Sequence, residues 1–347
     1  MTDNRSNRIL VTGGAGFIGS HTVVELVSAG FSPVVIDNFA NSEPEVLAEL
    51  EKITGSPVLC IHGDCADEAL VSKIISENEI SGIIHFAAYK AVGESVQEPL
   101  KYYQNNIGSL ISVLRAMKAT GVKNLVFSSS CTVYGQPDHL PVTEFSAVKP
   151  ATSPYGYTKQ VCEEMLKDVC RAEHDLSVLA LRYFNPIGAH PDGLIGELPR
   201  GVPNNLVPFL TQSVAGILPE LVIHGTDYNT PDGSCIRDYI HVCDLAIAHV
   251  KALEKAAQSH GFQVYNLGQG RGHTVLEVIT AFERATGLKV PYRIGPRRAG
   301  DVEQIWADTS KSNAELGWKT RYTIEDALSH AWNWQQNLMR RKKANLS

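Results

Sequence analysis

Tyr155 and Lys159 have the residue types and the spacing for proton transfer. They lie four residues apart in a segment with helical spacing, so they are expected to share one face of a helix. A free phenol, with a pKa of about 10, is a poor base near neutral pH, but a neighbouring ammonium group lowers that pKa. Ser130, about 25 residues earlier at the end of an apolar run, could hydrogen-bond the same oxygen. The three residues could therefore take the proton of a substrate hydroxyl while hydride leaves the same carbon.

A glycine-rich segment, residues 12–19, supplies a second piece of chemistry. It follows an apolar run, 9–11, and opens a helical pattern, which is the context that a dinucleotide-binding turn requires. Gly13 allows a tight turn, Gly16 lets the backbone approach a pyrophosphate, and Gly19 permits close packing of helix on strand. The start of the helix would offer N–H groups and a partial positive charge to the phosphates. A glycine turn without a ligand is the alternative.

Asp37 closes the next predicted strand, eighteen residues after Gly19. A carboxylate at this place accepts hydrogen bonds from the adenosine ribose and repels a 2′-phosphate, which favours NAD over NADP. Two further loops follow predicted strands and are expected to line the same groove. In residues 63–65, Asp64 could reach the adenine or could be an ordinary helix N-cap. In the other loop, small residues would let the cofactor pass over the sheet; it consists of Phe86, Ala87 and Ala88.

Short apolar runs alternate with helical patterns through the first half of the chain. Strands are predicted at residues 9–11, 34–36, 58–61, 82–86, 125–127 and 177–181, and helices at 21–29, 110–119 and 153–171. Strands that are apolar on both faces and alternate with helices indicate a parallel sheet covered on both sides. After about Arg182, glycine and proline become frequent and the alternation is lost. The predicted fold class is α/β: a Rossmann-type doubly wound parallel sheet with a smaller mixed α/β C-terminal substrate lobe.

The predicted domain boundaries follow from the point at which the alternation of strands and helices is lost. The cofactor-binding domain is expected at residues 8–185, and residues 236–258, a predicted strand and helix, are expected to return to it. The substrate lobe would consist of residues 186–235 and 259–338. Flexible tails are expected at 1–7 and 339–347.

The composition argues against several other classes of protein. A formal charge of −6 over 347 residues gives no excess of positive charge of the kind that binds nucleic acid or anionic membranes. No apolar run approaches the ~20 residues that span a bilayer, and the N-terminus lacks the apolar core of a signal peptide. The seven cysteines contain no C-x-x-C, which suits reduced thiols in a cytoplasmic protein. The twelve histidines form no H-E-x-x-H, so no metal site is expected.

With these residues in place, the chain resembles the extended short-chain dehydrogenases/reductases and, more narrowly, the UDP-glucose 4-epimerase (UDP-galactose 4-epimerase) family. The resemblance extends from Ile9 to about Trp334. It is carried by the segments VTGGAGFIGSH at 11–21, KAVGES at 90–95, FSSSCTVYG at 127–135, LRYFNP at 181–186, PNNL at 203–206, RDYIHV at 237–242 and PRRAGD at 296–301.

The resemblance implies a role for each matching residue. Tyr155 would be the base, with Ser130 and Lys159 as its partners; all three would also lie against NAD. Besides the three glycines and the 86–88 loop, the implied NAD contacts are Phe17, Ile18, Asp37, Asn38, Asp64, Cys65, Lys90, Asn105 and Phe184. The implied UDP-sugar contacts are Lys90, Ser130, Tyr155, Tyr183, Asn185, Asn204, Asn205, Leu206, Arg237, Tyr239, Arg298, Asp301 and Ile305.

The chemistry of a nucleotide diphosphate agrees with the two arginines in this set. Arginine binds phosphate oxygens in a fork and keeps its charge. Structural ion pairs with the neighbouring carboxylates, Arg237 with Asp238 and Arg298 with Asp301, are the alternative. The asparagines at 204–205 precede an apolar stretch and could cap a helix whose N–H groups face phosphate.

The reaction implied by the resemblance is redox-neutral inversion at C4 of a UDP-hexose through a transient 4-keto sugar, with NAD retained. Nucleotide-sugar 4,6-dehydratases are the nearest rivals, but they carry an Asp-Glu pair where this chain has Cys131 and Thr132. Enzymes that decarboxylate or 4-epimerise UDP-glucuronate stay open, as does a non-catalytic NAD-binding scaffold. UDP-glucose and UDP-galactose are the favoured pair. Acceptance of UDP-GlcNAc and UDP-GalNAc would depend on Ile305, which is intermediate in size and stiff at χ1.

A homodimer is the assembly that the resemblance suggests. Its contacts are expected on the helix at residues 110–119 and on the helix that carries Tyr155.

Overall fold

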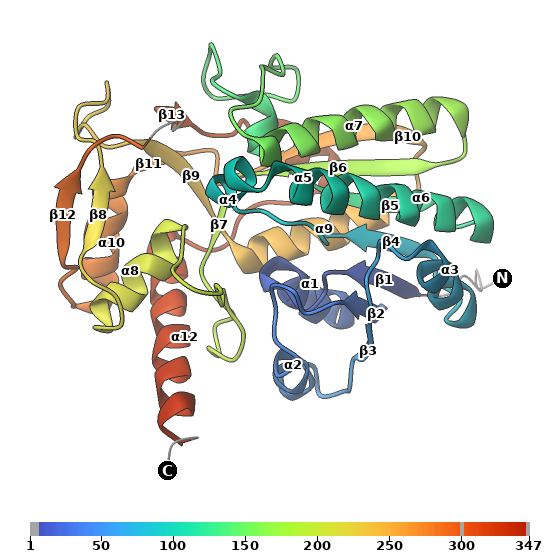
Figure 1. The fold of residues 1–347 in the computed structure, drawn as a ribbon, viewed down its shortest axis with the longest axis horizontal. Coiled ribbons are helices and arrows are strands. Elements are labelled where there is room, and N and C mark those ends of the chain that lie inside the picture. The colour runs from blue at the N-terminus through green and yellow to red at the C-terminus, as the bar shows by residue number, and fades with distance from the viewer. Residues whose placement is uncertain (1–6, 299–301, 345–347) are drawn as a thin grey trace.

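The computed structural model describes residues 7–298 and 302–344. Its centre is a parallel sheet of seven strands in the order β10-β6-β5-β4-β1-β2-β3 (Figure 1). The strands are β1 (Arg8–Thr12), β2 (Ser32–Asp37), β3 (Leu59–His62), β4 (Gly82–His85), β5 (Asn124–Ser130), β6 (Ser177–Tyr183) and β10 (Gly261–Leu267). The six strands predicted for the first half are all present, and the predicted α/β class is confirmed.

Helices cover both faces of this sheet. They are α1 (Phe17–Ser28), α2 (Val46–Thr54), α3 (Glu68–Glu77), α6 (Gly108–Thr120), α7 (Pro154–Ala172) and α9 (Val242–Ala256). Two short helices, α4 (Val92–Gln97) and α5 (Pro99–Tyr102), pack on α7. A π-helical turn, Tyr103–Ile107, leads into α6, and a 3₁₀ turn, Cys131–Tyr134, follows β5.

Alternate strand residues enter two separate apolar cores, which is why the strands have no polar face. Val126 belongs to the core under α1, α2 and α9, whereas Leu125 and Phe127 belong to the core under α3, α6 and α7. All three side chains are at most 1% exposed. Burial on both faces is expected of a parallel sheet between two helical layers.

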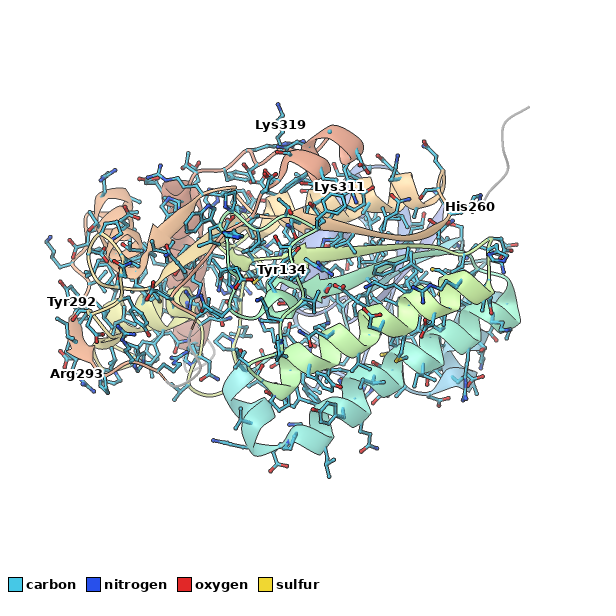
Figure 2. The ribbon with its side chains drawn as sticks, turned by 90° about the horizontal axis from the view of Figure 1, so that it is seen from above. Tyr134, His260, Tyr292, Arg293, Lys311 and Lys319 are labelled. Atoms are coloured by element: carbon cyan, nitrogen blue, oxygen red, sulfur yellow. The ribbon has the colours of Figure 1, made fainter. Side chains whose placement is uncertain are left out.

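The second lobe has two smaller sheets. One contains β7 (Asn185–Ile187), β9 (Ile236–His241), β11 (Gly272–Thr274) and β13 (Gln304–Ile305); the other pairs β8 (Leu221–His224) with β12 (Tyr292–Gly295). Its helices are α8 (Leu206–Val214), α10 (Val275–Thr286), α11 (Ser310–Leu316) and α12 (Ile324–Ala344). His260 before β10 and Tyr292 in β12 lie at opposite ends of the molecule, with Tyr134 between them (Figure 2).

The structure differs from the expectation for residues 236–258. The helix of this segment, α9, covers the large sheet beside α1, but its strand, β9, belongs to the second lobe. The strand that returns to the large sheet is β10, from the segment assigned to the substrate lobe. A short apolar run shows that a strand is buried without showing which sheet it joins. The division into two domains therefore stays a prediction.

The expected C-terminal tail also differs over its described part. α12 continues to Ala344. Arg341 in its last turns forms an ion pair with Glu49 of α2 at 3.2 Å and donates to the carbonyl oxygen of Leu194. The ion pair with Glu49 holds the end of the helix against the first lobe. No helix in the described part of the chain is long and apolar enough to cross a membrane.

Candidate active site

The predicted site residues gather at the carboxyl ends of the central strands. The glycine turn follows β1, Asp37 ends β2, the 86–88 loop follows β4, and Ser130 ends β5. In open α/β sheets, ligands bind outside this edge.

Two glycines of the turn, Gly13 and Gly19, have no room for a side chain. Gly13 has a φ of 69°, and a Cβ at this residue would lie 3.0 Å from the backbone nitrogen of Ala87. A Cβ at Gly19 would lie 2.3 Å from the carbonyl oxygen of Gly13, which is a forbidden contact. Gly16 precedes α1 without any side-chain cap, so the first N–H groups of the helix are left for an anion. The turn therefore fits a dinucleotide pyrophosphate.

Asp37 fastens the end of β2 to the glycine turn. Its carboxylate, 8% exposed, accepts hydrogen bonds at 2.9 Å from the backbone nitrogens of Ala15 and Phe39 and from the hydroxyl of Ser42. The adjacent Asn38 donates to Asp64 at 3.3 Å. The carboxylate thus sits where a ribose is expected, and it also organises the loop around that place.

Asp64 is not a helix N-cap, which is the alternative role that the sequence leaves open. The N-cap of α3 is Asp67, which accepts from the backbone nitrogen of Leu70 at 3.0 Å. Asp64 instead holds a turn by accepting from the nitrogen of Ala66, and Cys65 beside it is buried.

Lys90 and Asn105, which are also expected near the cofactor, lie on two different segments. The Lys90 ammonium nitrogen is 3.0 Å from a carboxylate oxygen of Glu197 and 5.7 Å from the ring centre of Phe17. Asn105 lies in the π-helical turn, a feature frequent at functional sites, and its amide donates to Asn106 at 3.0 Å.

Tyr155 occupies the first turn of α7. Ser153 caps this helix by accepting from the nitrogen of Gly156 at 3.2 Å, and Pro154 supplies the fixed φ suited to the first helical position. Burial raises the pKa of Tyr155, the nearby Tyr183 raises it further, and a hydrogen bond from Ser130 lowers it. Tyr155 as a whole is 9% exposed.

Lys159 lies in the next turn of α7, but its ammonium group points to the strand. Its nitrogen donates to the carbonyl oxygen of Ser128 at 2.6 Å and lies 4.9 Å from the ring centre of Phe127. Burial lowers the pKa of Lys159 to about 8. Burial has the largest effect on the pKa of Tyr155 and the net direction is upward, so the expected lowering by Lys159 stays a prediction.

The turn after β5 contains no carboxylate. Burial raises the pKa of the Cys131 thiol to about 12, while the charge of Arg237 acts in the opposite direction. The hydroxyl oxygen of Thr132 is buried, and no side-chain or backbone partner accompanies it among the described residues. Neither side chain can act as a carboxylic acid.

The second lobe brings its predicted residues to the same region through strand pairing. Asn185 of β7 pairs with Tyr239 of β9, and Ile305 of β13 pairs with Arg237. Ile305 is 4% exposed and packs in an apolar cluster with Phe184.

The alternative that the sequence left open for Arg237, an ion pair with Asp238, is replaced by another arrangement. The Asp238 carboxylate accepts from the backbone nitrogens of Gln269, Gly270 and Ala307. The Arg237 guanidinium donates to the carbonyl oxygen of Ile236 at 2.8 Å.

The remaining sugar-nucleotide candidates lie around α8 and the 296–301 segment. Asn205 occupies the N-cap position of α8, as expected, but its amide donates to Glu197 at 2.7 Å in place of capping. Leu206 opens the helix, and Asn204 and Arg298 are exposed. Asp301 lies outside the described residues.

Four residues of the site were missed by the sequence reasoning. Asn106 is buried between the 89–91 loop and α7, where it bonds both backbone groups of Tyr89 and the hydroxyl of Thr158. The others are Glu163, Arg182 and Glu197. Only Glu163 had a sequence signal, its place four residues after Lys159.

Tyr183 faces the same interior as the strand-end serines. Its hydroxyl shares a short hydrogen bond with Ser128, and burial raises the pKa of Tyr183 to about 12.

Comparisons with known proteins cover nearly the whole chain. Residues 10–331 match the model of the GDP-mannose 4,6 dehydratase family. The chain is 49% identical over 329 residues to a UDP-glucose 4-epimerase from Haemophilus influenzae, which covers 95% of this chain and 97% of the relative. The solved UDP-glucose-4-epimerase from Stenotrophomonas maltophila, with bound NAD and formylated UDP-arabinopyranose, superposes with a TM-score of 0.94 at 47% identity and covers 96% of this chain and 99% of that chain. The Bifidobacterium longum enzyme in complex with NAD⁺ and UDP gives a TM-score of 0.92 at 48% identity, covering 95% and 98%.

Proposed function

Because the chain belongs to the UDP-glucose 4-epimerase family, we propose that it interconverts UDP-galactose and UDP-glucose with retained NAD. The GDP-mannose 4,6 dehydratase family, whose model the chain also matches, is the broader of the two families. The observation that carries the proposal is a shared edge of the sheet: Ser130, which Tyr155 and Lys159 approach from α7, ends β5 at the edge where the glycine turn follows β1. The reaction is an isomerisation at C4 that passes through a transient 4-keto sugar.

NAD, when bound, supplies the hydride acceptor and donor of this reaction. The glycine turn would hold its pyrophosphate, and Asp37 would hold the adenosine ribose. Asn38, Asp64, Cys65, Lys90, Asn105 and Phe184 are proposed to complete the site.

Tyr155 is proposed to carry the proton. Its phenol would remove the proton of the C4 hydroxyl and return it after the sugar has turned, so one group serves both faces of the carbon. The bond from Ser130 favours the phenolate, whereas burial opposes it. Positive charge close to the phenol is therefore required for a base near neutral pH, and the Lys159 ammonium and an oxidised nicotinamide are its two sources.

Elimination chemistry is not proposed, although the matching family model is named for a dehydratase. Loss of water from a hexose needs an additional acid and base near the carbon that loses the hydroxyl. Cys131 and Thr132 follow Ser130 in the 3₁₀ turn, and a thiol with a pKa of about 12 is a poor proton donor at neutral pH.

The nucleotide is proposed to bind in the second lobe. Arg237 and Arg298 would contact the diphosphate, and Asn185, Asn204, Asn205, Leu206 and Tyr239 would complete the site, with Asp301 beyond the described residues. Ile305 would limit the space around C2 of the sugar, since it is buried in the cluster that contains Phe184.

The proposed assembly is a homodimer. α6 and α7 each expose an apolar or aromatic side chain, Ile111 at 36% and Tyr157 at 49%. Replacement of both by glutamate should yield monomers in sedimentation experiments; an unchanged mass would place the contact elsewhere. The cytoplasmic location expected from the sequence stays a prediction.

The decisive experiment supplies UDP-galactose to the purified chain without added cofactor and follows UDP-glucose by chromatography. Conversion is expected, because the NAD would be retained. Absence of conversion both without and with added NAD would refute the proposed function.

A further inference from the structure

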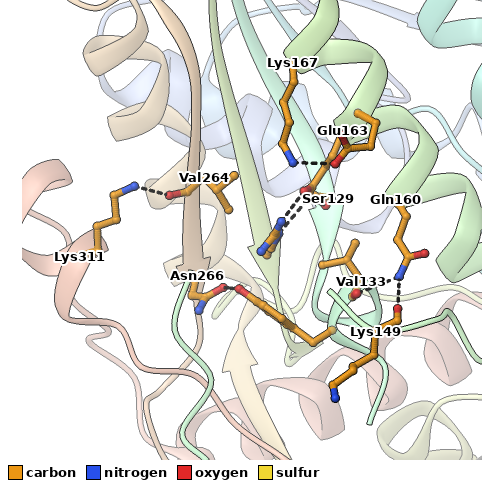
Figure 3. Close-up of polar contacts among 12 residues, drawn as sticks. Ser129, Val133, Lys149, Gln160, Glu163, Lys167, Val264, Asn266 and Lys311 are labelled. Carbon is orange, nitrogen blue, oxygen red and sulfur yellow. Dashed lines mark hydrogen bonds and ion pairs between the residues drawn. The ribbon is translucent and has the colours of Figure 1, made fainter. Parts of the chain in front are cut away.

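Glu163 repeats the spacing of the proposed catalytic pair. It lies one helical turn after Lys159, which itself lies one turn after Tyr155, so all three face the end of β5. One carboxylate oxygen of Glu163 accepts a hydrogen bond from the hydroxyl of Ser129 at 2.5 Å (Figure 3). Ser129 is the immediate neighbour of Ser130, so this contact fixes the residue next to the one that bonds the phenol.

Arg182 completes the arrangement from the adjacent strand. It is the direct partner of Ser129 in the β5–β6 pairing. Its guanidinium donates to both oxygens of Glu163, at 2.9 and 2.5 Å, and stacks over the ring of Tyr134 at 4.9 Å. The Glu163 and Arg182 side chains are each 3% exposed. One carboxylate thus holds the ends of two strands against α7.

The polar cluster of Ser129, Glu163 and Arg182 interrupts an otherwise apolar layer between the sheet and α7. Ser129 continues the row of Phe127, and Arg182 continues the row of Ala180, both of which belong to the apolar core under α7. The change from apolar to polar residues occurs only in the last layer before the active site. Apolar contacts tolerate small slides between a helix and a sheet, whereas a bidentate pair with a serine fixes one register.

Stability alone is a weak reason for this pair. A buried ion pair loses so much hydration that well-packed apolar residues often stabilise a protein as well or better. Removal of one partner is nevertheless strongly destabilising, because it leaves a buried charge. The ion pair is therefore best explained by geometry that the site requires.

We infer that Glu163, braced by Arg182, is a positioning residue that fixes β5 against α7 and so keeps Ser130 and the Ser128 carbonyl in place for Tyr155 and Lys159. The inference rests on the proposed function, because it concerns the same proton-transfer site. Glu163 acts through these residues and does not touch the substrate.

The charge of Glu163 also acts on Lys159. Burial lowers the pKa of Lys159 to about 8, while Cys162 and Glu163 both raise it. The groups that face this ammonium are the Ser128 carbonyl, the Phe127 ring, Cys162, Glu163 and His85, whose pKa is lowered to about 3 by burial and by the lysine charge. Loss of the Glu163 charge should therefore move the titration of Lys159 to lower pH.

The test compares Ser129→Ala and Glu163→Gln with the native holoenzyme. The control is Glu164→Gln, because Glu164 is the next residue of α7, is 67% exposed and pairs with Lys167. Both test variants should lower kcat about ten- to hundred-fold with little change in KM, since the nucleotide contacts lie elsewhere. The alkaline decline of kcat should shift to lower pH in Glu163→Gln and stay in place in Ser129→Ala. The control should match the native chain.

A double variant separates positioning from stability. Glu163→Gln with Arg182→Met removes both buried charges and should recover thermal stability relative to Glu163→Gln alone, while kcat stays low. Recovery of kcat together with stability would overturn the inference, as would native kcat in folded Ser129→Ala. If Glu163→Gln does not fold, Ser129→Ala and the double variant still decide. The two failures are distinguishable. An inactive native chain would refute the proposed function, whereas an active native chain with equally active Ser129→Ala would refute only the positioning role of Glu163.

Discussion

The Lys159 ammonium nitrogen lies 2.6 Å from the carbonyl oxygen of Ser128, so the lysine is anchored to the strand that ends at the active site. The anchor limits how closely the charge can approach the phenol of Tyr155. It also places a titratable cation in a buried position, where its protonation should be visible in the pH dependence of turnover.

Turnover should decline as the pH rises through about 8, because burial lowers the pKa of Lys159 to that value and its ammonium form is lost above it. The measurement is kcat for UDP-galactose between pH 6 and 10, with the alkaline limb compared between the native chain and Lys159→Met. A native profile that is flat to pH 10 would show that the ammonium charge is not needed.

Protonation of Lys159 should also affect the stability of the fold, but in the opposite direction to its effect on turnover. Its pKa in the folded chain is below the ordinary value of 10.5, so the buried ammonium destabilises the fold at neutral pH. This penalty is full below pH 8 and fades between pH 8 and 10.5. Lys159→Met should therefore gain thermal stability over the native chain at pH 7 and lose that advantage near pH 10.5. An advantage that does not depend on pH would contradict the titration of this lysine.

Tyr155→Phe should lose on the order of 10²–10⁴ in turnover, the usual contribution of a general base. The ring would still fill its buried place at the start of α7, so NAD should remain bound. Bound NAD is measured by chromatography of the denatured protein, alongside the rate of UDP-glucose formation. Turnover within a few-fold of native would exclude the phenol as the base.

Asp37→Ala should weaken NAD binding about ten- to hundred-fold, since hydrogen bonds to a charged group are lost and the loop anchored by the carboxylate is released. Asp67→Ala is the matched control, because the side chain of Asp67 caps α3 and the substitution leaves its backbone bond to Asp64 in place. It should cost about 1 kcal/mol of stability and leave NAD binding unchanged. Equal NAD retention in both variants would remove the ribose role from Asp37.

Ile305→Gly and Ile305→Tyr should differ in their activity on UDP-GalNAc. The glycine variant enlarges the space that Ile305 fills beside Phe184, and the tyrosine variant closes it. We expect a ratio of about 10- to 200-fold in kcat/KM between them, the range of size discrimination in an apolar pocket. Rates are taken per folded protein, because loss of a buried isoleucine costs about 2–5 kcal/mol. Equal rates would show that Ile305 does not face the acetamido group.

The parts of the fold that follow from local pattern were predictable from sequence. The glycine turn, Asp37 and Ser130 each end or follow an apolar run, and parallel strands bring such ends to one edge. Their contacts depend on the immediate backbone, so a single sequence suffices to place them.

The parts that depend on distant partners were not predictable. Glu163 and Arg182 are 19 residues apart in sequence and meet only because β5 and β6 pair in one register. Nothing in the loop around Glu197 indicates that Lys90 and Asn205 will share its carboxylate. The raised pKa of Tyr155 could not be predicted either, because burial, its largest cause, is a property of the assembled chain.

The position of β10 at the edge of the large sheet has a consequence for synthesis of the chain. β6 is complete at Tyr183, but its outer neighbour is complete only at Leu267. While the intervening 83 residues emerge from the ribosome, β6 presents an open edge of unpaired backbone groups on a mostly apolar strand, the kind of edge that templates aggregation. A gene fragment truncated after residue 185 would keep that edge permanently, so we expect it to aggregate when it is produced alone.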